Sequence, residues 1–263
     1  MKFLRFFSDG KIRYGILKEN EILEINWKPF EKKFEYTGKI FKLDEIKFLP
    51  PCEPPNIIAL GLNYKEHVEE GWEKVPEYPV IFLKATTSLT GHLSPIILPK
   101  EAPDEVDYEC ELVIVIGKKC KNIKEEEAKE FIFGYTCGND VSARDCQLKK
   151  DKQWARGKSF DTFCPIGPWI ETEIDPMNLR IKTILNGKVM QDSNTSKMIF
   201  NVYEIVSYLS RQMTLLPGTI ILTGTPSGVG FARKPPVYLK EGDLVEIEIE
   251  GIGTLKNFVI KEK

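Results

Sequence analysis

The sequence is poor in histidine and in metal-binding cysteine pairs. It has only two histidines, His67 and His92, and its six cysteines never form a Cys-x-x-Cys pair. Zinc sites and disulfide frameworks both depend on His or Cys residues at suitable spacings. We therefore expect reduced thiols in the core or on the surface, and the composition argues against a zinc hydrolase.

The sequence also has little net charge and no long apolar run. A net charge of −2, with no basic run between aromatic residues, gives no electrostatic case for binding nucleic acid. The longest purely aliphatic run, Leu112–Ile116, is far too short to span a membrane, and the first residues have no signal-peptide pattern. We expect a cytoplasmic protein that binds neither nucleic acid nor membrane. Its 263 residues, 42% of them apolar, can form a large core.

The first 50 residues have the pattern of a separate unit. Short β segments there are broken by Asp9-Gly10 and by Glu19-Asn20, residue pairs that favour turns. The Pro-rich stretch Leu49–Pro55 follows and is typical of a linker. The sequence thus predicts a small N-terminal β domain over residues 1–50 and a main domain over residues 51–263.

The main domain is predicted to be strand-rich α+β. "NIIALGL" and "TIILTG" predict buried strands, Asn186-Gly187 predicts a hairpin, and the C-terminal residues predict further strands. "EEEAKEFIF" and "VYEIVSYLSRQM" predict helices. Because strands outnumber helices and do not alternate regularly with them, a Rossmann sheet is disfavoured. "GTPSGVG" lacks the Walker lysine and the GxGxxG spacing, so it does not predict a phosphate loop.

Acidic residues alternate along "VDYECELVIVIG", residues 106–117, which we expect to form one strand. Asp107, Glu109 and Glu111 would share a face that continues as Val113 and Val115, so part of that face is shielded from water. The acid face of "VEIEIEG", by contrast, stays polar throughout, as in a half-solvated strand. Converging buried carboxylates repel one another, and a hard divalent cation relieves the repulsion. Spacing alone leaves open a metal site or a strand end that reaches solvent.

A second acidic stretch is "GYTCGNDVSARDCQ", in which Asp140 and Asp145 lie on either side of Arg144. Small polar residues dominate this stretch. It predicts either the capped start of a helix, with Asp140 or Ser142 as the N-cap, or part of a functional site. The residues themselves do not favour one alternative over the other.

A third stretch, "GLNYKEHVEE", contains His67 and, three residues later, Glu70. If the segment is helical, the two side chains share a face. A carboxylate that orients an imidazole is the usual arrangement of a general base. The alternative is an ordinary surface pair on a helix.

Taken together, these motifs resemble the fumarylacetoacetate hydrolase family. The resemblance is carried by "GLNYKEHVEE", "VDYECELVIVIG", "GYTCGNDVSARDCQ", "RGKSFDTFCPIGPWI", "LTGTPSGVG" and "LKEGDLVEIEIEGIGTLKN", which follow the family's order. It is to short single-chain bacterial and archaeal members, whose small variable domain the N-terminal residues also resemble. The resemblance implies a mixed β-sheet roll with short flanking helices, a bound Mg²⁺ or Mn²⁺, and a homodimer.

The same resemblance implies roles for individual side chains. Asp107 is not predicted to be a metal ligand, and Lys84 is given no role. The metal ligands would be Glu109, Glu111 and Asp140, the catalytic residues His67, Glu70 and Lys158, and the substrate-binding residues Arg144, Gln147 and Thr225.

The predicted activity follows from this set of residues. We expect a divalent-metal-dependent enzyme that acts on a small 2-oxo acid or diacid through a metal-bound enolate and hydrolyses a C–C bond of an acylpyruvate-type substrate. The alternative is a decarboxylase or isomerase with the same site, of the 2-hydroxyhepta-2,4-diene-1,7-dioate isomerase or oxaloacetate decarboxylase/tautomerase type. A non-catalytic metal-binding structural protein is a third possibility, but it has no use for His67 or Lys158.

Overall fold

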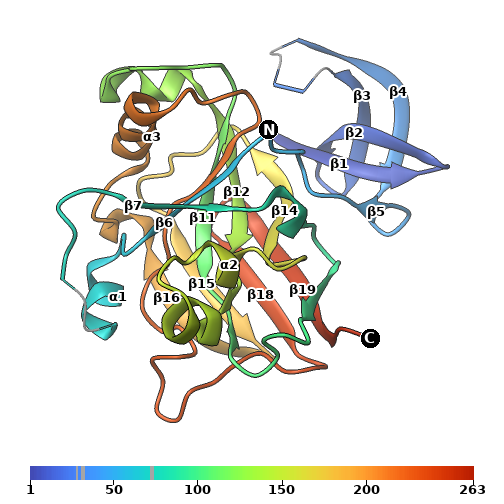
Figure 1. Cartoon of the computed structure of the whole chain (residues 1–263). Coiled ribbons are helices and arrows are strands. Elements are labelled where there is room, and N and C mark those ends of the chain that lie inside the picture. Colours follow the sequence, from blue (N-terminus) through green and yellow to red (C-terminus); the bar gives the residue numbers. More distant parts are fainter. Residues whose placement is uncertain (28, 31–32, 72–73) are drawn as a thin grey trace.

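A computed structural model describes residues 1–27, 29–30, 33–71 and 74–263 of the chain (Figure 1). Over these residues the largest sheet contains twelve strands, and its main path runs β4-β3-β2-β1-β14-β12-β11-β17-β6-β7. β5 pairs with β1 and β8 with β14. The strands are β1 Lys2–Ser8, β2 Lys11–Lys18, β3 Glu21–Trp27, β4 Phe34–Lys42, β5 Lys47–Phe48, β6 Ile57–Gly61, β7 Val80–Lys84, β8 Leu89–Thr90, β11 Cys110–Ile116, β12 Ile132–Asn139, β14 Cys164–Glu171 and β17 Ile220–Leu222.

A second sheet of five strands, in the order β16-β15-β18-β19-β9, packs against β11, β12 and β14 of the first. β10 and β13 form a separate short pair. These strands are β9 Pro95–Leu98, β10 Val106–Asp107, β13 Ser142–Ala143, β15 Arg180–Leu185, β16 Lys188–Asn194, β18 Leu244–Ile249 and β19 Gly253–Lys261. Both large sheets mix parallel and antiparallel pairs: β17 runs parallel to β6 and β19 parallel to β9, while the other pairs on the main path are antiparallel.

Helices are short and lie around the sheets (Figure 1). The longest is α3, which begins after Asn201; that residue and Glu204 form a reciprocal capping box. In the part of the chain that the structure describes, no helix has the length and apolarity needed to cross a membrane. The helices are α1 Lys65–Glu70, α2 Ala155–Lys158 and α3 Val202–Gln212, with 3₁₀ turns at Thr86–Ser88, Glu125–Glu130 and Thr195–Lys197 and a π-helix at Asp145–Lys150.

The strand-rich α+β prediction is therefore confirmed, including the N-terminal β strands. These strands extend to one side of the molecule in Figure 1, and β1 pairs directly with β14 of the main sheet, with Lys2 opposite Glu171. The hairpin predicted at Asn186-Gly187 joins β15 to β16. All six cysteines are buried and unpaired.

Strand β11 is buried on both faces, which explains its nearly continuous apolar sequence. Leu112 and Ile114 belong to the core between the two large sheets, together with Ile247 of β18. Val113 and Val115 belong to a second core cluster on the opposite face. Any acidic residue at the start of this strand therefore lies at the edge of the solvent-excluded core.

Two predicted elements differ in the structure. The expected single strand over residues 106–117 is interrupted between β10 and β11, because the Glu109 N–H donates to the Asn139 side chain (2.9 Å) instead of continuing a ladder. The helix expected in "EEEAKEFIF" is only the 3₁₀ turn Glu125–Glu130, and Ile132 already pairs with Ile116 in the sheet. Tertiary pairing outweighs local helix propensity there.

Candidate active site and metal centre

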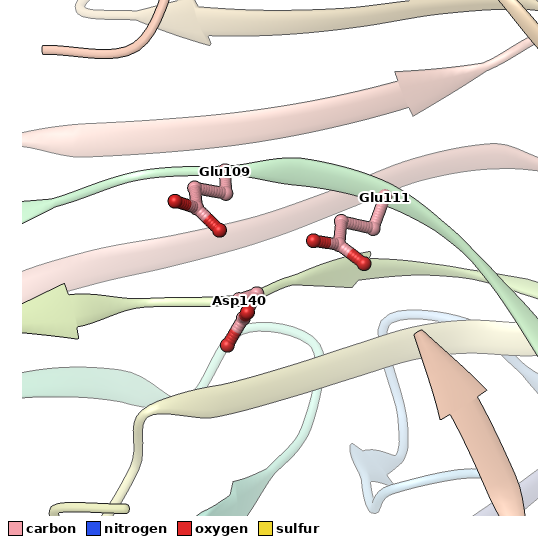
Figure 2. Close-up of side chains that lie close together, drawn as sticks. All are labelled: Glu109, Glu111 and Asp140. Atoms are coloured by element: carbon pink, nitrogen blue, oxygen red, sulfur yellow. The ribbon is translucent and has the colours of Figure 1, made fainter. Parts of the chain in front are cut away.

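Three carboxylates meet where β11 begins and β12 ends. Glu109 directly precedes β11, Glu111 is its second residue, and Asp140 directly follows β12, the antiparallel neighbour. The Asp140 N–H donates to the Glu109 carbonyl (3.0 Å), which places the two side chains across from each other. One oxygen from each carboxylate lies within 4.8 Å of the others, and all three residues are buried (Figure 2).

Glu111 is the carboxylate whose charge is least compensated. Its Oε2 accepts a hydrogen bond from the Gly224 N–H (2.7 Å), but its buried Oε1 has no hydrogen-bond partner among the described residues. Burial, reinforced by the charges of Asp140 and Glu109, raises the pKa of Glu111 well above its ordinary value. An orphaned oxygen within an all-oxygen donor set is what a hard divalent cation would satisfy, so the residues present fit Mg²⁺ or Mn²⁺.

Glu109, unlike Glu111, has its charge compensated by two cationic side chains. Lys158 Nζ donates to Glu109 Oε2 (2.7 Å), and Arg144 Nη2 lies 2.6 Å from Glu109 Oε1. Burial opposes ionisation of Glu109, but the two cations outweigh it and lower the pKa of this carboxyl to about 2. Lys158 also donates to Asp140 (2.7 Å), so one buried ammonium is shared by two of the three acids.

The His67–Glu70 pair forms on α1 as its spacing predicts. His67 Nδ1 lies 3.3 Å from Glu70 Oε2, and both side chains are largely buried. Glu70 is itself held by the Gly228 N–H, which donates to its two carboxylate oxygens at 2.9 and 3.1 Å. A carboxylate fixed in this way can orient the imidazole, which is the usual arrangement of a general base.

A cavity of about 130 Å³ opens next to these groups. Aromatic side chains of Phe82, Trp154 and Phe231 form part of its wall, so a ligand there is partly removed from water. Glu70, Glu111 and Asp140 do not line it. The predicted site residues on the cavity wall are His67, Glu109, Arg144, Gln147, Lys158 and Thr225.

Comparison with known proteins identifies the family of the chain. Residues 56–260 match the family described as fumarylacetoacetate (FAA) hydrolase C-terminal, and residues 1–51 match the family described as Rv2993c-like, N-terminal. The chain belongs to the fumarylacetoacetate hydrolase family. The resemblance seen in the sequence motifs is thereby confirmed.

Individual members of the fumarylacetoacetate hydrolase family are similar over most of the chain. A fumarylacetoacetate hydrolase domain-containing protein 2 homolog of Dictyostelium discoideum is 52% identical, covering 82% of this chain and 75% of the relative. Oxaloacetate tautomerase Fahd2a, mitochondrial, of Rattus norvegicus is 47% identical, covering 82% and 70%. A solved structure of 5-carboxymethyl-2-hydroxymuconate delta-isomerase from Mycobacterium smegmatis has a TM-score of 0.90 and 44% identity, covering 100% of both chains.

The second acidic stretch belongs to this site and does not cap a helix. Asp140 accepts from Lys158 and Lys84, and Ser142 lies in β13. The π-helix starts only at Asp145, whose side chain pairs with Lys150 and not with Arg144. Of the two alternatives for this stretch, the helix cap is thus excluded, and Asp140 joins the cluster with Glu109 and Glu111.

Two residues near the acids were not assigned a role from the sequence. Lys84 on β7, to which the family resemblance gave no role, is buried and donates to Asp140 Oδ1. Gln191 on β16 accepts from the Cys110 N–H (3.0 Å) and donates to Thr225 Oγ1 (2.8 Å). It thus ties the strand that carries Glu111 to the loop that carries Thr225, and nothing in its local sequence indicates this.

Proposed function

We propose that the protein interconverts the enol and keto forms of a small 2-oxo dicarboxylic acid, of which oxaloacetate is the simplest. The observation that carries the proposal is that His67 and Glu109 line one cavity, so a base and a cation-binding acid face the same ligand. The names of the relatives, an oxaloacetate tautomerase and a delta-isomerase, support proton transfer over C–C bond hydrolysis.

Glu109, Glu111 and Asp140 would hold one Mg²⁺ or Mn²⁺. Such a cation, when bound, supplies positive charge beside the keto oxygen and so favours the negative charge that develops on that oxygen. The contribution of the protein is to hold three carboxylates together at the edge of an apolar core, where water screens their charges less than at the surface.

His67 is the residue that moves the proton. In the keto-to-enol direction it takes the proton from carbon 3, the C–H electron pair becomes the C2–C3 double bond, and the C2=O π pair moves onto the oxygen, to which His67 then passes the same proton. The reverse direction returns the proton to carbon 3. Glu70 stabilises the imidazolium that exists between the two transfers, because its carboxylate contacts Nδ1. Neither direction consumes water, unlike the hydrolysis of an acylpyruvate.

Arg144, Gln147 and Lys158 would bind the anionic ends of the ligand. Arg144 is buried and remains charged, because Glu109 and Asp107 outweigh the cost of burial and raise its pKa. Its Nη1 donates to Gln147 Oε1 (2.8 Å), so the two side chains present donors side by side on the cavity wall. A planar guanidinium in a fixed orientation is well suited to bind a carboxylate.

The test compares two reactions of the Mg²⁺-loaded protein. We expect the ultraviolet absorbance of enol-oxaloacetate to decay faster with the protein than without it, and oxalate to inhibit this decay only when Mg²⁺ or Mn²⁺ is present. Glu111→Gln should abolish the acceleration. Glu248→Gln, on the half-solvated strand β18, is the matched control and should behave like the wild type.

Hydrolysis of an acylpyruvate is measured in parallel. If the protein cleaves the C–C bond of an acylpyruvate faster than it tautomerises oxaloacetate, the hydrolase prediction replaces the present proposal. If both reactions proceed at the uncatalysed rate with Mg²⁺ and with Mn²⁺, the proposal is wrong.

A further inference from the structure

Asp107 is a fully buried acid that the proposed mechanism does not use. It lies in β10, outside the cluster of Glu109, Glu111 and Asp140. Both of its oxygens are nevertheless occupied by donors. Oδ1 accepts from the N–H groups of Gly230 (2.7 Å) and Tyr108 (2.8 Å), and Oδ2 accepts from the Phe231 N–H (3.0 Å) and from Arg144 Nε (2.9 Å).

These bonds fix the guanidinium of Arg144 from one side. Gln147 accepts from its Nη1, Glu109 faces its Nη2, and the Phe231 ring lies over it with 4.5 Å between the guanidinium carbon and the ring centroid. Asp107 is the member of this set that contacts both the guanidinium and the backbone that carries the ring. It therefore couples the orientation of Arg144 to the position of residues 230–231.

The loop that carries Gly230 packs tightly against Asp107. A Cβ on Gly230 would overlap the Val237 carbonyl and lie 2.5 Å from Asp107 Oδ1, so glycine is required for the approach. A few residues earlier, Gly228 of the same loop donates to Glu70. One buried carboxylate thus helps to hold the loop that connects the arginine side of the cavity to the His67–Glu70 side.

We propose that Asp107 is a positioning residue that sets Arg144 for the distal carboxylate of a 2-oxo dicarboxylate. The inference rests on the proposed function only in its choice of a 2-oxo dicarboxylate as the ligand. Asp107 does not line the cavity and does not belong to the cluster of three acids, so its effect on a ligand passes through Arg144 and the loop.

The experiment measures binding by the Mn²⁺-loaded protein and does not depend on turnover. The probes are 2-oxoglutarate, which has a distal carboxylate, and 2-oxopentanoate, which has the same chain length without it. In Asp107→Asn the amide nitrogen must face two of the donors that now point at the carboxylate, which disturbs the link between Arg144 and the loop while conserving volume. We expect the affinity for 2-oxoglutarate to fall about 10- to 100-fold, the usual effect of losing a charge-assisted hydrogen bond.

Binding of 2-oxopentanoate and of Mn²⁺ should stay near the wild-type values in Asp107→Asn. The exposed Asp104→Asn is the control and should change neither probe. In an Arg144→Met background, Asp107→Asn should add little to the loss for 2-oxoglutarate, because both changes act through one group.

Two results would overturn the inference. A variant that loses affinity for both probes equally, or that only unfolds at a lower temperature, would show that Asp107 is merely structural. A wild type that binds both probes equally well would mean that Arg144 does not receive the distal carboxylate. Absence of tautomerase activity in the wild type bears on the proposed function and leaves this binding comparison intact.

Discussion

Two glutamates in neighbouring inward positions, Glu109 and Glu111, have opposite electrostatic surroundings. Glu109 faces Lys158 and Arg144, which stabilise its charge, whereas Glu111 accepts from the Gly224 N–H and lies beside the acids Asp140 and Glu109. In the folded chain the pKa of Glu111 therefore lies above that of the unfolded chain. As the pH rises above the ordinary carboxyl pKa, this difference lowers the free energy of unfolding of the cation-free protein. The reason is that the folded state keeps a proton that the unfolded state releases.

Glu111→Gln is expected to act on metal affinity and on stability in opposite directions. Calorimetry should show that the affinity for Mg²⁺ and Mn²⁺ falls by more than about 100-fold. Even the mutation of a residue that only hydrogen-bonds to a metal ligand lowers metal affinity by about 10- to 100-fold. Thermal unfolding at pH 7 with chelator should show a higher melting temperature than chelator-treated wild type, because the amide needs no proton. Unchanged metal affinity would exclude Glu111 as a ligand.

His67→Ala is expected to separate proton transfer from metal binding. His67 is not one of the three clustered acids, so calorimetry should give wild-type affinity for Mg²⁺. Turnover of enol-oxaloacetate should fall by about 10²- to 10⁴-fold, the usual contribution of a general base. Glu70→Gln should lower turnover less, because the amide still reaches His67 and Gly228. Turnover of His67→Ala at the wild-type rate would exclude His67 as the base.

Among the elements, the loop between β17 and β18 determines how the two sides of the cavity meet. Gly224 donates to Glu111, Thr225 lines the cavity, and Gly228 donates to Glu70. Gly228 has a φ of +100°, and a Cβ there would overlap the Met190 carbonyl. The backbone conformation and the close packing at Gly228 thus require glycine there.

Gly228→Ala and Gly187→Ala form a matched pair. Both glycines have positive φ, but a Cβ at Gly187 meets nothing within 4 Å. Gly187→Ala should cost about 1–2 kcal/mol in the free energy of unfolding, the price of the left-handed backbone. Gly228→Ala should cost about 1–3 kcal/mol more through overpacking, and should also lower turnover because Glu70 loses its anchor. Chemical denaturation measures the first quantity, and equal costs for the two variants would contradict the argument.

At the scale of the whole molecule, His92 links β5 of the twelve-stranded sheet to β19 of the five-stranded sheet. Its ring packs edge-on against Phe48 of β5, with 4.7 Å between centroids, and its Nδ1 accepts from the Lys256 N–H of β19 (3.1 Å). Burial and the charge of Lys256 lower the pKa of His92 to about 4. The ring is therefore neutral in the folded protein at a pH where the unfolded chain would protonate it.

This difference predicts a loss of stability in mild acid. Because the folded pKa is depressed, the stabilisation is complete above pH 6.5 and is lost as pH falls toward 4. Between pH 7 and pH 5 the free energy of unfolding should drop by about 2 kcal/mol more in the wild type than in His92→Asn, which keeps the acceptor but not the titration. Denaturation curves at the two pH values measure this, and parallel losses would exclude His92 as the cause.

Several whole-molecule properties stay predictions. They are the division of the chain at residue 50, the homodimer and the cytoplasmic location. The pairing of β1 with β14 means that any division at residue 50 would separate the linked strands of one sheet.

Much of the candidate site could be predicted from local sequence. A spacing of two along a strand places Glu109 and Glu111 on one side, and a spacing of three on a helix brings His67 to Glu70, because the two periodicities are properties of the backbone itself. Apolar content likewise predicted which strands lie inside. The family motifs added Asp140, Arg144, Gln147, Lys158 and Thr225, whose convergence no local rule implies.

The pairing of each acid with its cation was decided only by the tertiary structure. Asp107 and Arg144 are 37 residues apart, Lys84 and Asp140 are 56 apart, and Cys110 and Gln191 are 81 apart. Contacts at such separations depend on how the two sheets pack and where the loops between them cross, and no periodicity of the chain encodes that. The sequence by itself thus determined the kinds of groups and the faces they occupy. Packing determined that one Glu111 oxygen has no hydrogen-bond partner among the residues that the structure describes while Glu109 is neutralised, because neighbouring charges become unequal only through burial among different partners.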